Sequence, residues 1–232
     1  MILTDYIEFE HETHQYTNID GEVVPSVTGF IKQFSKPFDA DFWAQKKADE
    51  EGITKEEMLQ KWVDKRELGT AIHDSLSNYI KSGGVTVLHD GVSNWIKEQL
   101  DTLMNNPDLT LYSEQIIYSQ ELNLAGTVDL IVRYKDTNTM YLIDFKTDKS
   151  LTGYYHTKNS EGILVPCSRM YYPYDSYFDT NLNHYKVQIL KYSEILNKNE
   201  YLCNPKISEI WHLPKSKIYG DLWKPYQPKP RL

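Results

Sequence analysis

The sequence predicts a single α/β domain with a central mixed β-sheet flanked by helices. Hydrophobic residues recur at helical spacing over residues 67–80 and 90–104, and three strand-like runs follow directly. A further helical run, residues 181–196, separates these strands from a last strand-like run at 206–213. Because neither an internal repeat nor a break in composition divides the chain, we expect one domain.

The composition is that of an ordinary globular protein, with 40% hydrophobic and 25% charged residues among 232. Two cysteines, Cys167 and Cys203, are too few for a disulfide framework, so a reducing cytoplasm is the expected compartment. The start of the chain lacks a basic segment followed by an apolar core, which argues against a signal peptide. No run approaches the ~20 apolar residues of a membrane span, so no membrane partner is expected.

The formal net charge of −8 argues mildly against a nucleic-acid partner, but the charge is unevenly distributed. Residues 1–116 hold 10 basic and 21 acidic side chains, whereas residues 117–232 hold 15 basic and 12 acidic ones. Since local potential decides whether a polyanion binds, the second half allows a basic surface. Charge alone therefore neither supports nor excludes a nucleic acid.

The N-terminal region reads as a hairpin followed by charged helices. Residues 5–24 alternate between polar and apolar side chains, and Asp20-Gly21 is typical of a tight turn. Residues 40–65 are highly charged and helix-like, and Thr54 and Glu57 fit a capping box. These helices could form an arch over a binding site or simply be solvated.

The middle of the chain carries the predicted helices and the sheet. The helix over 67–80 ends at Ser82-Gly83-Gly84, and the next helix covers 90–104. Three strands are predicted over residues 111–120, 124–134 and 139–147. Their short links are typical of antiparallel hairpins.

The last third is less regular. Residues 148–178 are irregular and rich in tyrosine, and they could stack unpaired bases or form an insertion packed on the core. After the helix at 181–196 and the strand at 206–213, the proline-rich tail is expected to run over the surface.

Two aspartates lie inside apolar strands, where an unpaired carboxylate is costly. Asp129 belongs to the run 124–134 and Asp144 to the run 140–145, with Lys146 two positions beyond Asp144. Because side chains alternate along a strand, Asp144 and Lys146 share one face. The group predicts a site for a hard cation and a phosphate, and the alternative is a structural ion pair.

Four motifs in this order resemble the PD-(D/E)XK nuclease superfamily, in its RecB-type and phage-exonuclease branch. They are Gly69-Thr-Ala-Ile-His73, Gly126-Thr-Val-Asp129, Asp144-Phe-Lys146 and Gln188-Ile-Leu-Lys-Tyr192. Each pattern is weak alone, and the four together, on the expected elements, are specific. The leader from His14 through Pro25-Ser-Val-Thr28 is also similar to phage members of the group.

The resemblance implies a restriction-endonuclease-like core over residues 66–213. Residues 1–65 would then be an N-terminal extension of hairpin and helices, and residues 214–232 a proline-rich tail. The whole chain, 1–232, would form one nuclease domain.

The resemblance also implies a metal site. His73 would ligate a divalent ion together with Asp129, Asp144 and the backbone carbonyl of Phe145, and Glu114 would join them. This donor set suits Mg²⁺, and Mn²⁺ is expected to substitute for it. Taken alone, a helical histidine beside an apolar stripe is more often structural, and Glu114 is as readily an exposed residue of an edge strand.

The remaining motif residues are assigned to substrate and catalysis. Lys146 would act beside the scissile phosphate, orienting water and stabilising charge on the phosphoryl oxygens. Gln188 and Tyr192 share a helix face and would bind the substrate backbone or brace Lys146, unless they are only a helix surface. Gly69 and Thr70 would allow close approach of a metal or phosphate to their helix.

The expected activity is metal-dependent hydrolysis of DNA, most simply by an exonuclease in recombination, repair or end processing. The alternatives are a structure-specific or restriction-like endonuclease and a non-catalytic nucleic-acid-binding module. Two cysteines cannot ligate the iron–sulfur cluster of some relatives. Single-stranded or duplex DNA ends are the expected partner, with a recombination or single-strand-binding protein and an oligomer as further options. The expected location is the cytoplasm, that of the host if a phage encodes the chain.

Overall fold

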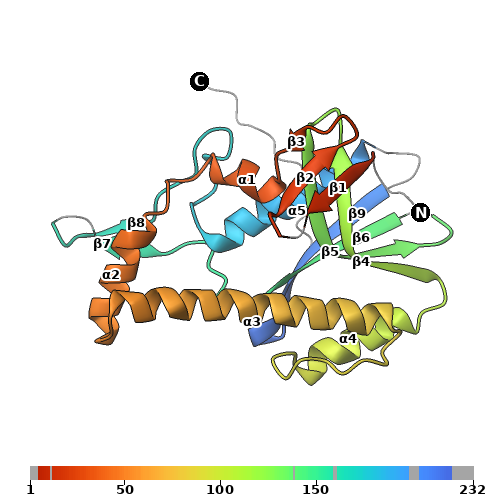
Figure 1. Ribbon diagram of the computed structural model, residues 1–232, viewed down its shortest axis with the longest axis horizontal. Helices are drawn as coiled ribbons and strands as arrows, with labels where there is room; N and C mark the ends of the chain where they lie inside the picture. Colours follow the sequence, from red (N-terminus) through yellow and green to blue (C-terminus); the bar gives the residue numbers. More distant parts are fainter. Residues whose placement is uncertain (1–4, 11, 138, 159–160, 199–203, 221–232) are drawn as a thin grey trace.

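A five-stranded mixed sheet forms the centre of the computed structural model, which describes residues 5–220 apart from 11, 138, 159–160 and 199–203 (Figure 1). The strand order is β10-β9-β6-β5-β4. The strands are β4 (Leu109–Ser119), β5 (Leu124–Tyr134), β6 (Thr139–Lys146), β9 (Asn204–His212) and β10 (Lys217–Tyr219). β6 and β9 run parallel, and the other neighbours run antiparallel. The predicted α/β class with a mixed central sheet is confirmed.

Helices cover both faces of this sheet. α3 (Lys55–Lys81) and α4 (Asn94–Met104) pack on one face, and α1 (Val27–Lys32) and α5 (Asn181–Asn197) pack on the other (Figure 1). The α3–α4 core includes Leu76, Leu100, Leu130 and Phe145, and the α5 core includes Val128, Leu142, Val187 and Ile195. The sheet therefore separates two hydrophobic cores.

α3 is one continuous helix of 27 residues, about 40 Å long. The predicted capping box is present, since Thr54 and Glu57 exchange hydrogen bonds at the start of α3. The sequence suggested two separate helices here, and that prediction is wrong because no proline or turn interrupts the chain around Arg66. The predicted boundary between extension and core, at residues 65–66, consequently falls inside α3.

The N-terminal segment forms a three-stranded sheet rather than the predicted hairpin. Its strands are β1 (Ile7–Glu10), β2 (Gln15–Asn18) and β3 (Val23–Val24). The predicted turn at Asp20-Gly21 joins β2 to β3, and Gly21 has φ +79°, a conformation that favours glycine. β1 adds to the pair β2–β3 because its Ile7 and Phe9 pack against the cluster of Tyr16 and Val24 at the end of the main sheet.

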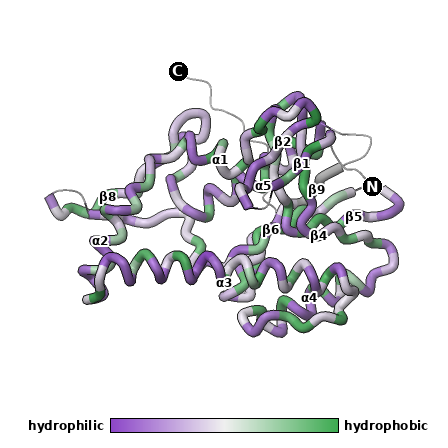
Figure 2. Tube along the Cα trace, in the orientation of Figure 1, coloured by the Kyte–Doolittle hydropathy of each residue, from purple (hydrophilic) through white to green (hydrophobic). Residues whose placement is uncertain are grey.

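The other end of the molecule holds the start of α3 together with α2 (Ala40–Glu51) and a small hairpin (Figure 1). The hairpin strands, β7 (His156–Lys158) and β8 (Leu164–Pro166), lie in the segment predicted to be irregular. Figure 2 shows that this end is more hydrophilic than the region of the main sheet. Among the residues that the structure describes, Ala44, Ala48 and Met58 form a small buried cluster at this end, with Ile53 and Trp62 packed against it.

The remaining differences from the sequence prediction are local. α4 begins at Asn94 rather than at residue 90, because the Ser93 hydroxyl caps it. The tail after Pro214 first forms the edge strand β10, so only residues 221–232 of the predicted surface tail lie outside the described residues. Among the described helices, none combines the length and the apolar character needed to cross a membrane.

Candidate metal and catalytic site

The site is built where the sheet changes its regular pairing. Glu114 on β4 and Asp129 on β5 stand opposite each other, because the residues on either side of them pair in register. The pairing of β5 with β6 ends at Leu130 and Ile143. Beyond that point the backbone N–H of Phe145 donates to Asp129 Oδ2 over 2.6 Å. A buried carboxylate thus accepts a hydrogen bond at the fork between two strands.

The backbone of β4 is kinked at Glu114. Its φ of +49° lies in the left-handed region, which costs an ordinary residue about 1–2 kcal/mol. Leu111 packs in the α3–α4 core, whereas Ile117 packs in the α5 core. A regular strand would place these two residues, six positions apart, on the same face. The kink therefore reverses the alternation of side chains along β4, so that Glu114 and Ile116 face α3 while Ile117 faces α5.

α3 contributes a histidine to the two opposed carboxylates. His73 Nδ1 lies 3.5 Å from Asp129 Oδ1. One ligand atom from each of His73, Glu114 and Asp129 lies within 4.8 Å of the other two. We call these three residues the metal cluster, because two carboxylates and an imidazole can together hold a divalent cation.

The protonation of the metal cluster is strongly perturbed. Burial alone would lower the pKa of His73, but the charge and hydrogen bonding of Asp129 outweigh burial and raise the pKa to about 9. Burial and the charge of Asp129 raise the pKa of Glu114 to about 7. Burial would raise the pKa of Asp129, and the His73 imidazolium reverses this and lowers it. A proton on His73 thus balances the Asp129 carboxylate.

A second group of residues, which we call the lysine cluster, lies on the α5 side of β6. Lys146 Nζ is 2.7 Å from Asp144 Oδ2, donates to Gln188 Oε1 over 3.4 Å, and lies 4.2 Å from the centre of the Tyr185 ring. The Gln188 amide donates to the Tyr192 hydroxyl over 2.7 Å. The lysine cluster thus consists of Asp144, Lys146, Tyr185, Gln188 and Tyr192.

The charges of the lysine cluster support each other. Burial would lower the pKa of Lys146, but the charges of Asp144 and Asp129 raise it above the ordinary value. Burial raises the pKa of Asp144 to about 6, against the opposing effect of Lys146. Asp144 Oδ2 is buried, and the Lys146 ammonium is its one polar partner among the described residues.

Two motif glycines allow close packing around the site. A Cβ at Gly126 would lie 2.5 Å from the ring of Tyr192, so only glycine lets α5 approach β5 this closely. A Cβ at Gly69 would lie 3.1 Å from Thr147 Oγ1, at the end of β6. Each glycine therefore sets the distance between a helix and the sheet.

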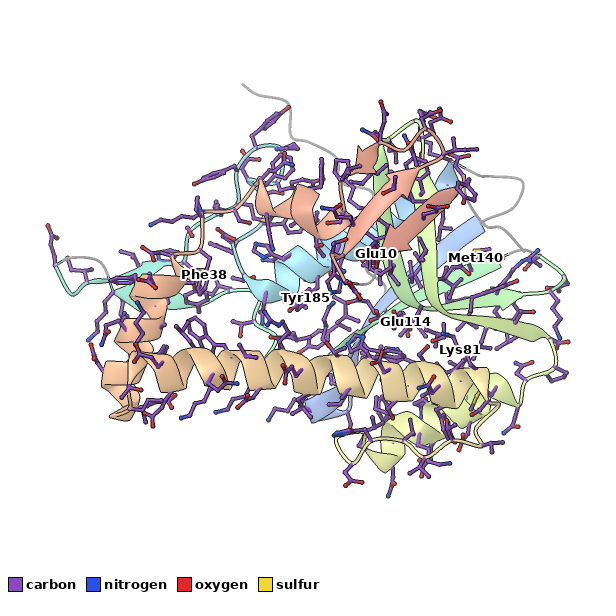
Figure 3. All side chains as sticks on the ribbon, viewed as in Figure 1. Glu10, Phe38, Lys81, Glu114, Met140 and Tyr185 are labelled. Carbon is purple, nitrogen blue, oxygen red and sulfur yellow. The ribbon has the colours of Figure 1, made fainter. Side chains whose placement is uncertain are left out.

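The predicted site residues thus fall into two adjacent groups rather than one ligand set. His73 and Asp129 come together as expected, and Glu114 joins them. Asp144 lies outside this three-residue group and is ion-paired with Lys146. Phe145 contributes its N–H to Asp129, and the ligand role predicted for its carbonyl stays a prediction. Figure 3 shows Glu114 near α3 and Tyr185 near α5.

The residues predicted to bind substrate differ in exposure. Gln188 and Tyr192 are buried and contact each other, which matches the alternative that they brace Lys146. Gly69 and Thr70 line a cleft beside the metal cluster, and the Thr70 hydroxyl donates to the carbonyl of Arg66 within the helix. Their predicted contact with substrate stays a prediction.

The sequence analysis missed Tyr185 and Asp148. The Tyr185 hydroxyl donates to Asp148 Oδ2 over 2.7 Å, while its ring lies against the Lys146 ammonium. Spacing offered a signal for both: Tyr185 is three positions before Gln188 on a helix, and Asp148 is two positions after Lys146.

Comparison with known proteins adds no assignment. The sequence matches no protein-family model, and no curated protein is detectably similar to it. The case for a function therefore rests on the motifs and on the geometry of the two clusters.

Proposed function

We propose that this chain is a divalent-metal-dependent nuclease of the PD-(D/E)XK superfamily with a restriction-endonuclease-like core. The proposed reaction is hydrolysis of DNA phosphodiester bonds from an end, as an exonuclease. One observation carries the proposal: residues from all four motifs meet at one fork in the sheet. The contacts that join them are His73 to Asp129, Lys146 to Asp144, and Lys146 to Gln188, with Gly126 against Tyr192.

The donor set fits a divalent cation such as Mg²⁺ or Mn²⁺. His73, Glu114 and Asp129 would hold it, and Asp144, whose buried Oδ2 is paired with the Lys146 ammonium, adjoins them. When bound, such an ion supplies Lewis-acid stabilisation of the charge on the reacting phosphate. Its ligands must lose their protons first. The His73 imidazole then has to be neutral, and the Glu114 carboxyl has to be ionised.

Lys146 is the proposed electrostatic catalyst among the chain's own residues. Its ammonium is held by Asp144, Gln188 and the ring of Tyr185, and so is fixed before substrate arrives. A fixed positive charge stabilises the oxygens of a phosphoryl group without reorganisation during the reaction. Tyr192 and Gly126 support this arrangement through Gln188 and through close packing of α5 on β5.

Digestion of end-labelled DNA tests the proposal directly. We expect single- or double-stranded DNA to be degraded with Mg²⁺ or Mn²⁺ and to stay intact with a chelator. Wild-type protein without cleavage under any of these conditions would overturn the proposed activity. Binding without cleavage would then favour a non-catalytic nucleic-acid-binding module.

A covalently closed DNA circle separates the two nuclease classes. An exonuclease needs an end, so the circle should survive while the same DNA, once linearised, is degraded. Cleavage of the circle would replace the exonuclease proposal by a structure-specific or restriction-like endonuclease. The role in recombination, repair or end processing, the partner proteins, the oligomeric state and the cytoplasmic location stay predictions.

A further inference from the structure

A cleft of about 670 Å³ opens on the α3 side of the metal cluster. His73 and Glu114 line it, so the cleft and the metal cluster share side chains. One wall is α3, the floor is formed by β4 and β5, and the N-terminal sheet supplies the opposite wall through Phe9, His14 and Tyr16. Figure 1 shows the N-terminal sheet beside β4 and β5, above the second half of α3.

The N-terminal sheet is anchored beside the site. The Tyr16 hydroxyl and Thr127 Oγ1 form a hydrogen bond of 2.9 Å, and Thr127 comes two residues before Asp129 on β5. The N–H of Ala125 donates to the carbonyl of Pro25, and Ser26 pairs with Ala125 as a parallel bridge. The segment after β3 thus lies alongside β5. Tyr16 is itself buried. The wall of the cleft is therefore fixed to the same strand that carries Asp129.

Two rings of this wall lie together at the cleft. The ring centroids of Phe9 and His14 are 5.9 Å apart, and Tyr16 supports Phe9 from 4.7 Å. Phe9 is half-buried, and His14 is exposed with a φ of +53°, in the left-handed region. Aromatic rings held beside a reactive centre provide a surface on which unpaired bases stack.

A lysine lies at the end of the opposite wall. Lys81, in the last turn of α3, lines the cleft and forms no ion pair with any residue that the structure describes. Figure 3 shows Lys81 on the same stretch of α3 that passes below Glu114. An ammonium in this wall of the cleft can pair with a backbone phosphate.

We propose that this cleft binds the unpaired nucleotides next to the scissile phosphate of a single DNA strand. The bases stack on Phe9 and His14, and Lys81 pairs with a phosphate. The volume lies within the roughly 300–1,000 Å³ of small-ligand sites, which suits one or two unpaired nucleotides. The inference rests on the proposed nuclease function for the position of the reacting bond, and the binding itself is testable without cleavage.

Three substitutions change the cleft while sparing the fold. Phe9→Leu keeps the apolar packing and removes the aromatic face. His14→Asn removes the ring at a left-handed position that asparagine tolerates, and Lys81→Gln removes the charge. Matched controls are Tyr6→Leu, an exposed aromatic just before β1, and Lys32→Gln, a last-turn lysine of α1. Neither control residue lines the cleft.

Fluorescence anisotropy with labelled oligothymidylate measures the effect, with every variant made in an Asp144→Asn background so that the DNA stays intact. We expect each cleft substitution to weaken binding about tenfold, as loss of one stacked base or phosphate contact does, and each control to stay within about twofold. Affinity for a blunt hairpin duplex should not change. Thermal melting of each variant identifies any that fails to fold.

Three results would overturn the inference: no binding of oligothymidylate, equal binding by cleft and control variants, or equal weakening for single strand and duplex. Crosslinking of a 5-iodouracil oligonucleotide should label the peptide that contains Phe9 and His14, and a label confined to other peptides contradicts the placement. Cleavage by wild-type protein is scored separately. Cleft-dependent binding without cleavage refutes the proposed function alone, whereas metal-dependent cleavage with unaltered binding in the variants refutes the cleft alone.

Discussion

The metal cluster and the lysine cluster lie on opposite sides of β6, yet they hold their charges in different ways. The metal cluster joins three groups that all bind protons, and its pKa values are spread by burial and by the charge of Asp129. In the lysine cluster the ammonium of Lys146 is permanently present and is held from three directions. The first group can exchange its protons for a metal, whereas the second is already neutralised.

Under the proposed function, this difference suits the two clusters to separate tasks. A cation-binding site needs ligands that become free of protons, and His73 and Glu114 meet that need. An electrostatic catalyst needs a charge that is fixed before the substrate binds, and the Lys146 ammonium meets this requirement. The Phe145 backbone joins the clusters, because its N–H binds Asp129 while the neighbouring residues, Asp144 and Lys146, face α5.

The largest expected effect is on cleavage. Lys146→Met and Asp144→Asn should each lower the cleavage rate on the order of 10²–10³-fold, because the fixed charge beside the phosphate is lost or misplaced. The rate is measured with end-labelled DNA at saturating Mg²⁺. Lys191→Met is the matched control, since Lys191, on α5, likewise pairs with an acidic residue, Glu194, and lies over an aromatic ring, that of Phe30 on α1. A control that loses as much activity as Lys146→Met would argue against a special role for Lys146.

The next effect separates the clusters by metal affinity. His73→Asn should weaken Mn²⁺ binding about 10- to 100-fold, since it removes a proposed ligand. His184→Asn is the control, because His184 also pairs with an aspartate, Asp179 at 2.6 Å, and is similarly exposed. Calorimetric titration measures both. Equal affinity in the two variants would remove His73 from the ligand set.

Packing between the clusters gives a smaller effect, on stability. Gly126→Ala should lower the free energy of unfolding by about 1–3 kcal/mol, because the new Cβ meets the Tyr192 ring at 2.5 Å. Gly153→Ala is the control, since its Cβ would meet Leu182 at an ordinary 3.5 Å. Chemical denaturation measures both changes. A Gly126→Ala protein as stable as the control would show that α5 adjusts at no cost.

A further expected effect is a pH dependence. The folded, metal-free protein holds protons on His73 and Glu114 more tightly than the unfolded chain does, because their pKa values are raised to about 9 and about 7. The folded state therefore binds more protons, and its stability should fall as pH rises from about 5 to 9. Mn²⁺ affinity should rise over the same range, by at most about tenfold per pH unit for each proton released.

Melting curves and titrations between pH 5 and 9 check both slopes. A metal-free protein that gains stability with rising pH in this window would contradict the protonated His73–Asp129 pair. An affinity for Mn²⁺ that does not change with pH would exclude His73 and Glu114 as ligands.

Strand periodicity and motif order were enough to predict the central part of the fold and most of the residues that meet in the two clusters. Asp144 and Lys146 share a face because alternation is a property of any strand, and the capping box at Thr54 is a local signal. The length of α3 was missed, since weak local cues at Arg66 and Gly69 do not stop a helix whose two ends are both anchored by buried residues, Met58 near the start and Ile72 to Ile80 near the end.

The division into two clusters was beyond the sequence. It depends on the left-handed backbone of Glu114, an unusual conformation for a glutamate, and on the end of the β5–β6 pairing after Leu130. Both arise from tertiary packing rather than from local preference. The structure thereby moves Glu114, the weakest of the predicted site residues, into the metal cluster and Asp144 into the lysine cluster.

Parallel titration of Mn²⁺ into wild type, Asp129→Asn and Lys146→Met tests the two-cluster account most directly. Asp129→Asn removes the carboxylate that both His73 and the Phe145 N–H contact, and its Mn²⁺ affinity should fall at least about tenfold. Lys146→Met should bind Mn²⁺ as tightly as wild type or more tightly, because a nearby positive charge is lost, while its cleavage rate falls on the order of 10²–10³-fold. A loss of Mn²⁺ affinity in Lys146→Met as great as that in Asp129→Asn would contradict the account. A wild-type protein that binds no Mn²⁺ would contradict it as well.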